Sequence, residues 1–381
     1  MIALARKTLA YEWRRFVPSV FAVGFAGVLL VMQAALVLGI FSTAAIYVSA
    51  SSADLWVGYP GTQSVNFGRT ISPDVEMRLR MEPEIGAVEP YVWVDGDWRA
   101  RSASAEAVGG VSIYLSGIST ADGAMMFDRV LAPWQRQLLR EPGAVIVDRA
   151  DLPTLASTEG GAAWINNHPV RIVAAVDGLR GLGGVKVISS LYSAREISEQ
   201  PASRGSTYLL ARVRKGSDVK AVQQRLQQAG SSFGPHEVWT AAAFARRSQL
   251  YWMFDTGAGA GVLFMAIVVC LVGAVVTSQS LKSVVAGSAR EYAVLNALGV
   301  SRAALGRVVV EQACWIGGMG LLLAMVASTA LLSLARVYRV PVALNGTAML
   351  ACAALVAVLA LLSGIGAMRG LLRADPATLL R

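Results

Sequence analysis

The sequence predicts an α-helical membrane protein with four transmembrane helices and a mixed α+β extracytoplasmic domain inserted between the first and second helices. Four long segments contain no charged residue: residues 16–53, 256–281, 312–335 and 340–368. Each is longer than the roughly 20 residues that a helix needs to cross the ~30 Å hydrocarbon core of a bilayer. The first two segments are separated by residues 54–255, which have an ordinary charged composition. We therefore expect an integral membrane protein with one large inserted domain.

The distribution of charge predicts the orientation in the membrane. The inserted domain has 21 basic and 21 acidic residues, so the net charge of +9 lies in the membrane portion. Most of those basic residues lie in residues 1–15, in the loop of residues 282–311 and in the tail of residues 369–381. Short segments rich in Lys and Arg stay in the cytoplasm. We therefore expect both termini and this loop in the cytoplasm of a bacterial inner-membrane protein, with the inserted domain in the periplasm; only Arg336 and Arg339 oppose this.

The first charge-free segment is longer than a bilayer requires. We expect its helix to continue beyond the membrane as a stalk up to residue 53. A signal peptide is the alternative, but its apolar region spans only about 7–15 residues. Residues 1–15 form either an amphipathic helix in the cytoplasmic interface or a simple extension of the first span.

The inserted domain shows both helical and strand patterns. We expect helices at residues 73–80, 133–140, 218–229 and 241–254, the last being a second stalk that leads into the second span. Strand patterns occur at residues 54–57, 111–118, 144–147, 170–176 and 207–213. Residues 88–101 predict a β-hairpin that turns at Asp95-Gly96, because Asp-Gly favours a tight two-residue turn.

No catalytic, cofactor-binding or metal-binding residue is predicted. Cys270, Cys314 and Cys352 all fall in predicted spans, so the inserted domain has neither a disulfide framework nor a Cys/His metal set. The chain lacks the Gly-x-x-x-x-Gly-Lys-Ser/Thr phosphate loop, and the Gly-rich residues 178–186 predict a mobile loop instead. Because the basic charge is divided among three segments beside the membrane, nucleic-acid binding is disfavoured.

The cytoplasmic loop contains the most informative pattern, Arg-Glu-Tyr-Ala-Val-Leu-Asn-Ala-Leu-Gly-Val-Ser-Arg at residues 290–302. It predicts a helix that ends at Gly299, where a positive φ suits glycine, and a second helix that Ser301 caps. A short helix held between two spans can act as a lever. The alternative is a surface helix that merely joins the two spans.

This segment resembles the signature of FtsX-like, or MacB-type, ABC transporter permeases. The C-terminal Arg-Ala-Asp-Pro-Ala-Thr-Leu-Leu-Arg of residues 373–381 is similar to the terminal Asp-Pro-Ala motif of that family. One span, a large outer domain and three further spans also match it, which implies the type VII ABC exporter architecture. Residues 53–56 and 66–69 resemble the DevC branch more narrowly.

The resemblance implies a homodimeric permease that works with a separate cytoplasmic ABC ATPase, which binds the ATP. The chain itself is then not an enzyme. The residues that match the family's ATPase-coupling element are Arg290, Glu291, Leu295, Leu298, Gly299, Ser301 and Arg302. DevC-like members also work with a periplasmic adaptor (a membrane fusion protein) and a TolC-like outer-membrane channel. The alternatives are an FtsX-like regulator of cell-wall hydrolases, a lipoprotein-release permease and a haem-export permease.

Overall fold

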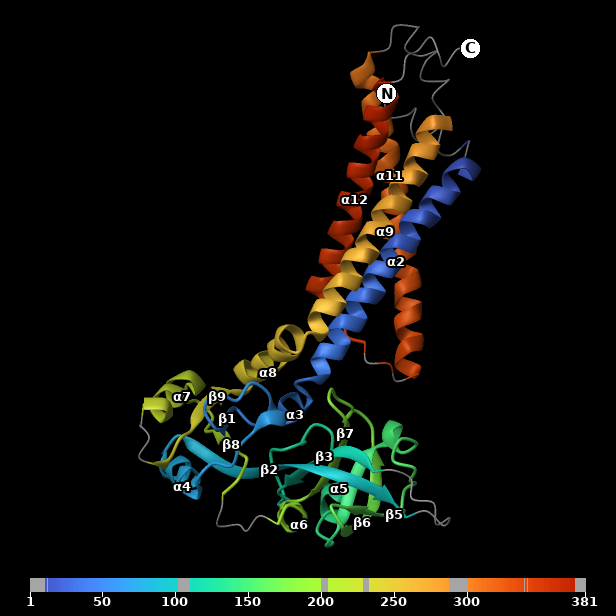
Figure 1. The fold of residues 1–381 in the computed structure, drawn as a ribbon. Coiled ribbons are helices and arrows are strands. Elements are labelled where there is room, and N and C mark those ends of the chain that lie inside the picture. Colours follow the sequence, from blue (N-terminus) through green and yellow to red (C-terminus); the bar gives the residue numbers. More distant parts are fainter. Residues whose placement is uncertain are drawn as a thin grey trace. The chain divides into compact units, whose positions relative to one another are not determined.

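The computed structural model describes residues 11, 13–101, 110–199, 205–228, 233–287, 301–338, 340 and 342–373. These residues form two compact units (Figure 1). The helical unit comprises the described parts of Met1–Gly39 and Gly259–Arg381, and the inserted unit comprises those of Ile40–Ala258.

The helical unit is built from long apolar helices: α2 (Trp13–Thr43), α9 (Ala258–Gly287), α11 (Arg302–Val337) and α12 (Gly346–Arg373). Within the described ranges, three segments are long and apolar enough to cross a membrane, namely Phe16–Thr43, Gly259–Ser280 and Val310–Val337. They confirm three of the four predicted spans by length and composition. In α12 the apolar segment found among the described residues is the shorter Gly346–Leu359, so the fourth span stays a prediction.

Small residues bring these helices close together. A Cβ added to Gly320 of α11 would lie 2.7 Å from Val23 of α2, and one added to Gly27 would lie 2.7 Å from Ala324 Cβ. The Ser280 hydroxyl of α9 also donates to the Ser19 hydroxyl of α2 across 2.8 Å. Since lipid is as apolar as these side chains, such close approach and interhelical hydrogen bonds hold the helices together.

The inserted unit is mixed α and β, as predicted. Its described strands are β1 (Leu55–Gly58), β2 (Ile85–Ala100), β3 (Val111–Ile118), β4 (Ala144–Asp148), β5 (Ala162–Ile165), β6 (His168–Val176), β7 (Val185–Ser190), β8 (Tyr208–Val213) and β9 (Glu237–Thr240). Its α-helices are α3 (Ile46–Ser49), α4 (Pro73–Met81), α5 (Pro133–Leu138), α6 (Leu191–Ile197), α7 (Val219–Gln228) and α8 (Ala241–Leu250). A π-helical turn, Tyr251–Asp255, follows α8.

Part of the unit is an antiparallel sheet in the order β9-β1-β8-β2. Leu55 and Val57 of β1 face α4 and α7, whereas Trp56 faces a second apolar cluster on the opposite side. Successive side chains of a strand point to opposite faces, so an uninterrupted apolar run suits a strand that is buried on both. The chain order β1-α4-β2 and β8-α7-β9 gives the split β-α-β arrangement.

The rest of the strands close into a ring. The second half of β2 pairs with both β3 and β5, and β7, β4 and β6 complete the circuit β2-β3-β7-β4-β6-β5-β2. All six strands contribute side chains to one buried cluster, including Trp98, Leu115 and Val147. Closure leaves no free strand edge among these six strands and fills the interior with apolar side chains.

The predicted hairpin at Asp95-Gly96 is wrong, because β2 runs without a turn from Ile85 to Ala100. Gly96 instead pairs with Ile113 inside the ring. A Cβ at this position would lie 3.0 Å from Ile165 and 3.1 Å from Ile113. The glycine therefore provides room for two isoleucines, and long-range strand pairing overrides the local turn preference.

The predicted first stalk is also wrong as a continuous helix. The helix α2 ends at Thr43, a turn follows, and α3 covers only Ile46–Ser49. The second predicted stalk begins as expected, because the Thr240 hydroxyl caps α8 by accepting from Ala243 N at 3.2 Å.

Candidate functional site

The predicted coupling element lies mostly outside the described residues. This applies to Arg290, Glu291, Leu295, Leu298 and Gly299. Of the other two, Ser301 is exposed and directly precedes α11, which begins at Arg302. From there α11 continues without a break to Val337, so a helix does lead from this loop into the third span as predicted. The coupling role itself stays a prediction.

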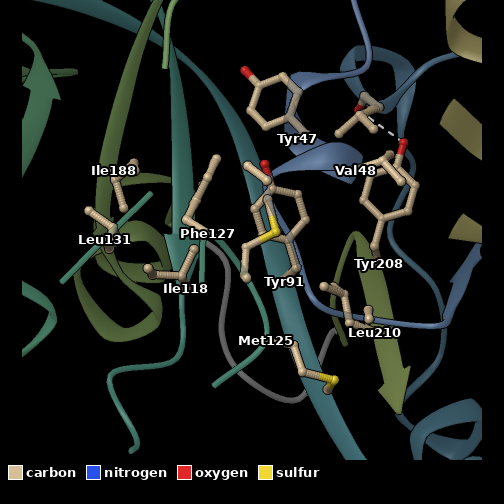
Figure 2. Close-up of a cluster of buried hydrophobic side chains, with 14 of the residues drawn as sticks. Tyr47, Val48, Tyr91, Ile118, Met125, Phe127, Leu131, Ile188, Tyr208 and Leu210 are labelled. Carbon is tan, nitrogen blue, oxygen red and sulfur yellow. Dashed lines mark hydrogen bonds between the residues drawn. The ribbon is translucent and has the colours of Figure 1, made fainter. Parts of the chain in front are cut away.

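The described residues instead provide a candidate site where the chain enters and leaves the inserted unit. Both connecting segments contribute to one buried cluster, Tyr47 and Val48 from α3 and Phe244 from α8. The Phe244 ring stacks on Trp239 at 4.6 Å and contacts Trp56 at 5.6 Å. Figure 2 shows Tyr47 and Val48 within this cluster, together with Tyr91 and Tyr208 of the sheet. We call this buried cluster the junction core; it includes Tyr47, Val48, Trp56, Tyr91, Tyr208, Trp239 and Phe244.

A neighbouring loop fastens the C-terminal end of α3. The Ala50 carbonyl accepts from Arg129 N at 3.3 Å, and Ser52 N donates to the Met125 carbonyl at 3.0 Å. The Arg129 guanidinium donates to the Ser49 carbonyl at 3.0 Å. Three attachments within four residues leave the end of α3 little freedom to move relative to the loop.

Two buried side chains of opposite charge, Glu89 and Arg136, hold that loop in turn. The Glu89 carboxylate accepts from the backbone N–H groups of Met125 and Met126. The Arg136 guanidinium donates to the carbonyls of Ser119 (2.8 Å) and Met126 (2.6 Å). Burial raises the pKa of the Glu89 carboxyl, and the two amides and the Arg136 charge limit the rise. Charge and hydrogen bonds thus connect α3 to β2 and α5 through this loop.

A buried lysine completes the junction. Lys186 of β7 is 1% exposed, and its ammonium donates to the Tyr47 hydroxyl at 3.1 Å and to the Leu182 carbonyl at 3.3 Å. The ammonium also lies 4.3 Å from the Tyr47 ring centroid and 5.4 Å from that of Tyr114. Burial lowers the pKa of Lys186 to about 7, although the Asp151 charge opposes the shift. Burial also raises the pKa of Tyr47, which keeps its hydroxyl protonated.

The Gly-rich segment predicted to be a mobile loop is held around this lysine. The Asp148 carboxylate accepts from the backbone N–H groups of Leu179 (2.8 Å) and Arg180 (3.2 Å). A Cβ added to Gly181 would lie 2.3 Å from Lys186 Cε. The backbone at this glycine therefore passes directly against the lysine side chain, and a larger residue here would displace the end of the lysine.

Sequence reasoning missed Lys186, Tyr47, Glu89 and Arg136. A signal for Lys186 exists in Val185-Lys-Val-Ile188, where one charge interrupts an apolar strand-like run. Burial of a lone charge in such a run requires partners that are distant in sequence. The described residues contain no group of three or more His, Cys, Asp or Glu side chains that could hold a metal ion.

The comparisons with known proteins concern both parts of the chain. Residues 263–376 match the family described as FtsX-like permease C-terminal. The periplasmic region of MacB from Actinobacillus actinomycetemcomitans is 10% identical with a TM-score of 0.36; the match covers 52% of this chain and 94% of that one. The extracellular domain of the ABC-type transporter YknZ from Gram-positive bacteria is 11% identical with a TM-score of 0.34, covering 50% and 100%. No curated protein matches the sequence.

Proposed function

We propose, from the match of residues 263–376 to the FtsX-like permease C-terminal family, that the chain is the permease subunit of an ABC-type export system. A separate cytoplasmic ATPase binds and hydrolyses ATP. The permease acts as a homodimer in the inner membrane with both termini in the cytoplasm. It transmits the motion of the ATPase to the inserted unit on the periplasmic side, and this motion expels the substrate.

One observation carries this proposal: both connections of the inserted unit are anchored in the same junction core. A displacement of α3 acts on Tyr47 and on the loop that Glu89 holds, and a displacement of α8 acts on Phe244. Because protein interiors are close-packed, such a displacement moves the surrounding side chains rather than being absorbed. The inserted unit is therefore built to respond to motion at either connection.

On the cytoplasmic side, the predicted coupling element forms the contact with the ATPase. Its residues are Arg290, Glu291, Leu295, Leu298, Gly299, Ser301 and Arg302. On the outer side, the inserted unit works with a periplasmic adaptor and a TolC-like outer-membrane channel, as in the DevC branch.

A flexible insertion tests the transmission directly. We expect a Gly-Ser-Gly insertion after Thr43, at the turn between α2 and α3, to preserve ATPase binding but to abolish the ATP-dependent change in hydrogen exchange of the inserted unit. The matched control is the same insertion after Gly216, an exposed turn with no atom within 4 Å of an added Cβ. If the two insertions leave the same ATP-dependent exchange, the anchored connections do not transmit motion.

A further inference from the structure

The helical unit contains an apolar cavity between α2, α11 and α12. Its volume is about 270 Å³, and it is lined by Gly27, Val31, Leu321, Leu322, Ala324, Met325, Ser328, Thr329, Leu332, Leu344, Met349, Cys352, Ala353 and Val356. An engineered apolar cavity of about 150 Å³ holds benzene, so by proportion this one accepts roughly ten carbon atoms. Nothing in the function proposed above requires such a hollow.

One polar group in the cavity lacks a partner. Ser328 is 2% exposed, and among the described residues its hydroxyl has no hydrogen-bond partner. The other polar side chains of the lining are satisfied, since the Thr329 hydroxyl donates to the Val326 carbonyl at 2.8 Å and the Cys352 thiol lies 4.0 Å from the Leu30 carbonyl. A buried hydroxyl without a partner costs free energy, so its position indicates a ligand that carries a hydrogen-bond acceptor.

Water is not the occupant of this cavity, because the lining offers too few hydrogen-bond partners. A buried water needs two to four polar partners, and an apolar cavity of this kind stays dry. A single unpaired hydroxyl on an otherwise apolar wall provides too few. The occupant must therefore be largely apolar with one acceptor group.

The rim of the cavity favours lipid over a second copy of the chain. Leu322 is 69% exposed, Met325 is 62% exposed and Met349 is 42% exposed. Helices that associate within a membrane approach through small residues, whereas this rim is formed by large flexible side chains. Methionine in particular adapts to an irregular flexible chain. Leu322 and Met325 lie in Val310–Val337, a segment with the length and composition to span a bilayer, where acyl chains surround it, and Met349 lies in the shorter apolar segment Gly346–Leu359.

We propose that the cavity binds one acyl chain of a membrane glycerophospholipid, with the Ser328 hydroxyl donating a hydrogen bond to the ester carbonyl oxygen of that chain. The apolar walls hold the first methylene groups, and the rest of the chain leaves past Met325 and Met349. The bound chain fills the hollow between three helices and so supports their packing. This lipid site is independent of which substrate the chain exports.

Photolabelling of the full chain tests the site. The protein is reconstituted in phosphatidylcholine vesicles that contain a phosphatidylcholine with a diazirine on its acyl chain, and adducts are mapped by mass spectrometry. We expect adducts at the cavity lining, and we expect Ala353→Phe, which fills the cavity, to reduce them about ten-fold, equivalent to a loss of about 1.4 kcal/mol. The control is Ala354→Phe, at the adjacent position of α12, which is exposed and outside the lining.

A second pair of variants tests the hydrogen bond without adding bulk. The native chain should be labelled more strongly by the ester-linked lipid than by an ether-linked analogue, and Ser328→Ala should remove that preference. Ser333→Ala is the control, because the Ser333 hydroxyl already donates to the Ala330 carbonyl at 2.7 Å. Equal labelling of Ala353→Phe and Ala354→Phe would mean general lipid contact and overturn the proposal. Disulfide-linked dimers through Met349→Cys without lipid adducts would assign the cavity to a second copy and overturn it equally.

Discussion

The buried Lys186 makes the stability of the inserted unit depend on pH in a predictable way. Burial lowers the pKa of this lysine from 10.5 to about 7 in the folded state. Between these two values the unfolded chain binds a proton that the folded chain lacks, so the free energy of unfolding rises with pH. The slope is at most about 1.4 kcal/mol per pH unit. Below pH 7 both states carry the proton, and this contribution no longer changes.

Lys186→Met removes the titrating group while keeping an unbranched side chain. We expect the difference in unfolding free energy between the native chain and this variant to grow by about 2–3 kcal/mol in favour of the native chain from pH 7 to pH 9. The loss of the hydrogen bond to Tyr47 adds a penalty that does not depend on pH in this range, because the Tyr47 hydroxyl stays protonated.

Urea unfolding of the full chain in detergent, followed by tryptophan fluorescence, measures this difference. Trp56 and Trp98 report on the inserted unit because both are buried there. The control is Lys215→Met, which removes an exposed lysine and should give a difference that does not vary with pH. A constant difference for Lys186→Met as well would show that the lysine does not titrate near neutrality, and the assignment of its environment would be wrong.

Three further predictions concern other parts of the chain. Leu298→Asp should abolish ATPase coupling but not membrane insertion, because it places a charge in an apolar protein contact; unchanged stimulated ATP turnover would contradict the lever assignment. Gly96→Ala should destabilise the chain by about 1–3 kcal/mol in the same urea assay, because its Cβ would crowd two isoleucines in the ring. Gly86→Ala on the same strand, where the nearest atom is 3.5 Å away, should cost far less, and equal costs would refute the packing argument. Reporter fusions at Lys215 should be active in the periplasm and fusions at Arg381 in the cytoplasm, and the opposite pattern would invert the topology.

Local patterns predicted many elements of the inserted unit. The strand expected at residues 111–118 is β3, and the helix expected at residues 218–229 is α7, which the structure describes over Val219–Gln228. In α4 the Ser72 hydroxyl accepts from Asp74 N at 3.3 Å and caps the helix, which begins at Pro73 where the sequence predicted it. These signals depend on neighbouring residues alone, so the sequence contains them.

Three strands, β5, β7 and β9, were not predicted from the sequence, and each omission has a physical reason. β5 and β9 have four residues each and are only partly buried, whereas β1, which has the same length and was predicted, is buried throughout. β7 follows a Gly-rich run and contains Lys186, both of which argue locally against a buried strand. The closure of the ring depends on β2 pairing with β5 over more than sixty residues of sequence, which no local pattern specifies.

The junction core also could not be predicted from the sequence. Tyr47 lies in the segment predicted to be a helical stalk beyond the first span, and its partners are Phe127, 6.2 Å away between ring centroids, and Lys186. Only the folded chain brings these residues together. The cytoplasmic coupling element is the opposite case, because its linear motif predicts it from the sequence alone, whereas most of its residues lie outside the described part of the chain, so it stays a prediction.

The central claim is that a separate ATPase moves the inserted unit, and a distance measurement on the reconstituted complex tests it most directly. Spin labels at Lys215→Cys, in a background where Cys270, Cys314 and Cys352 are replaced by serine, report the separation of the two inserted units of a dimer. We expect this separation to shift when a non-hydrolysable ATP analogue binds the ATPase, and Leu298→Asp to abolish the shift. A complex that binds the analogue with an unchanged separation would contradict the account.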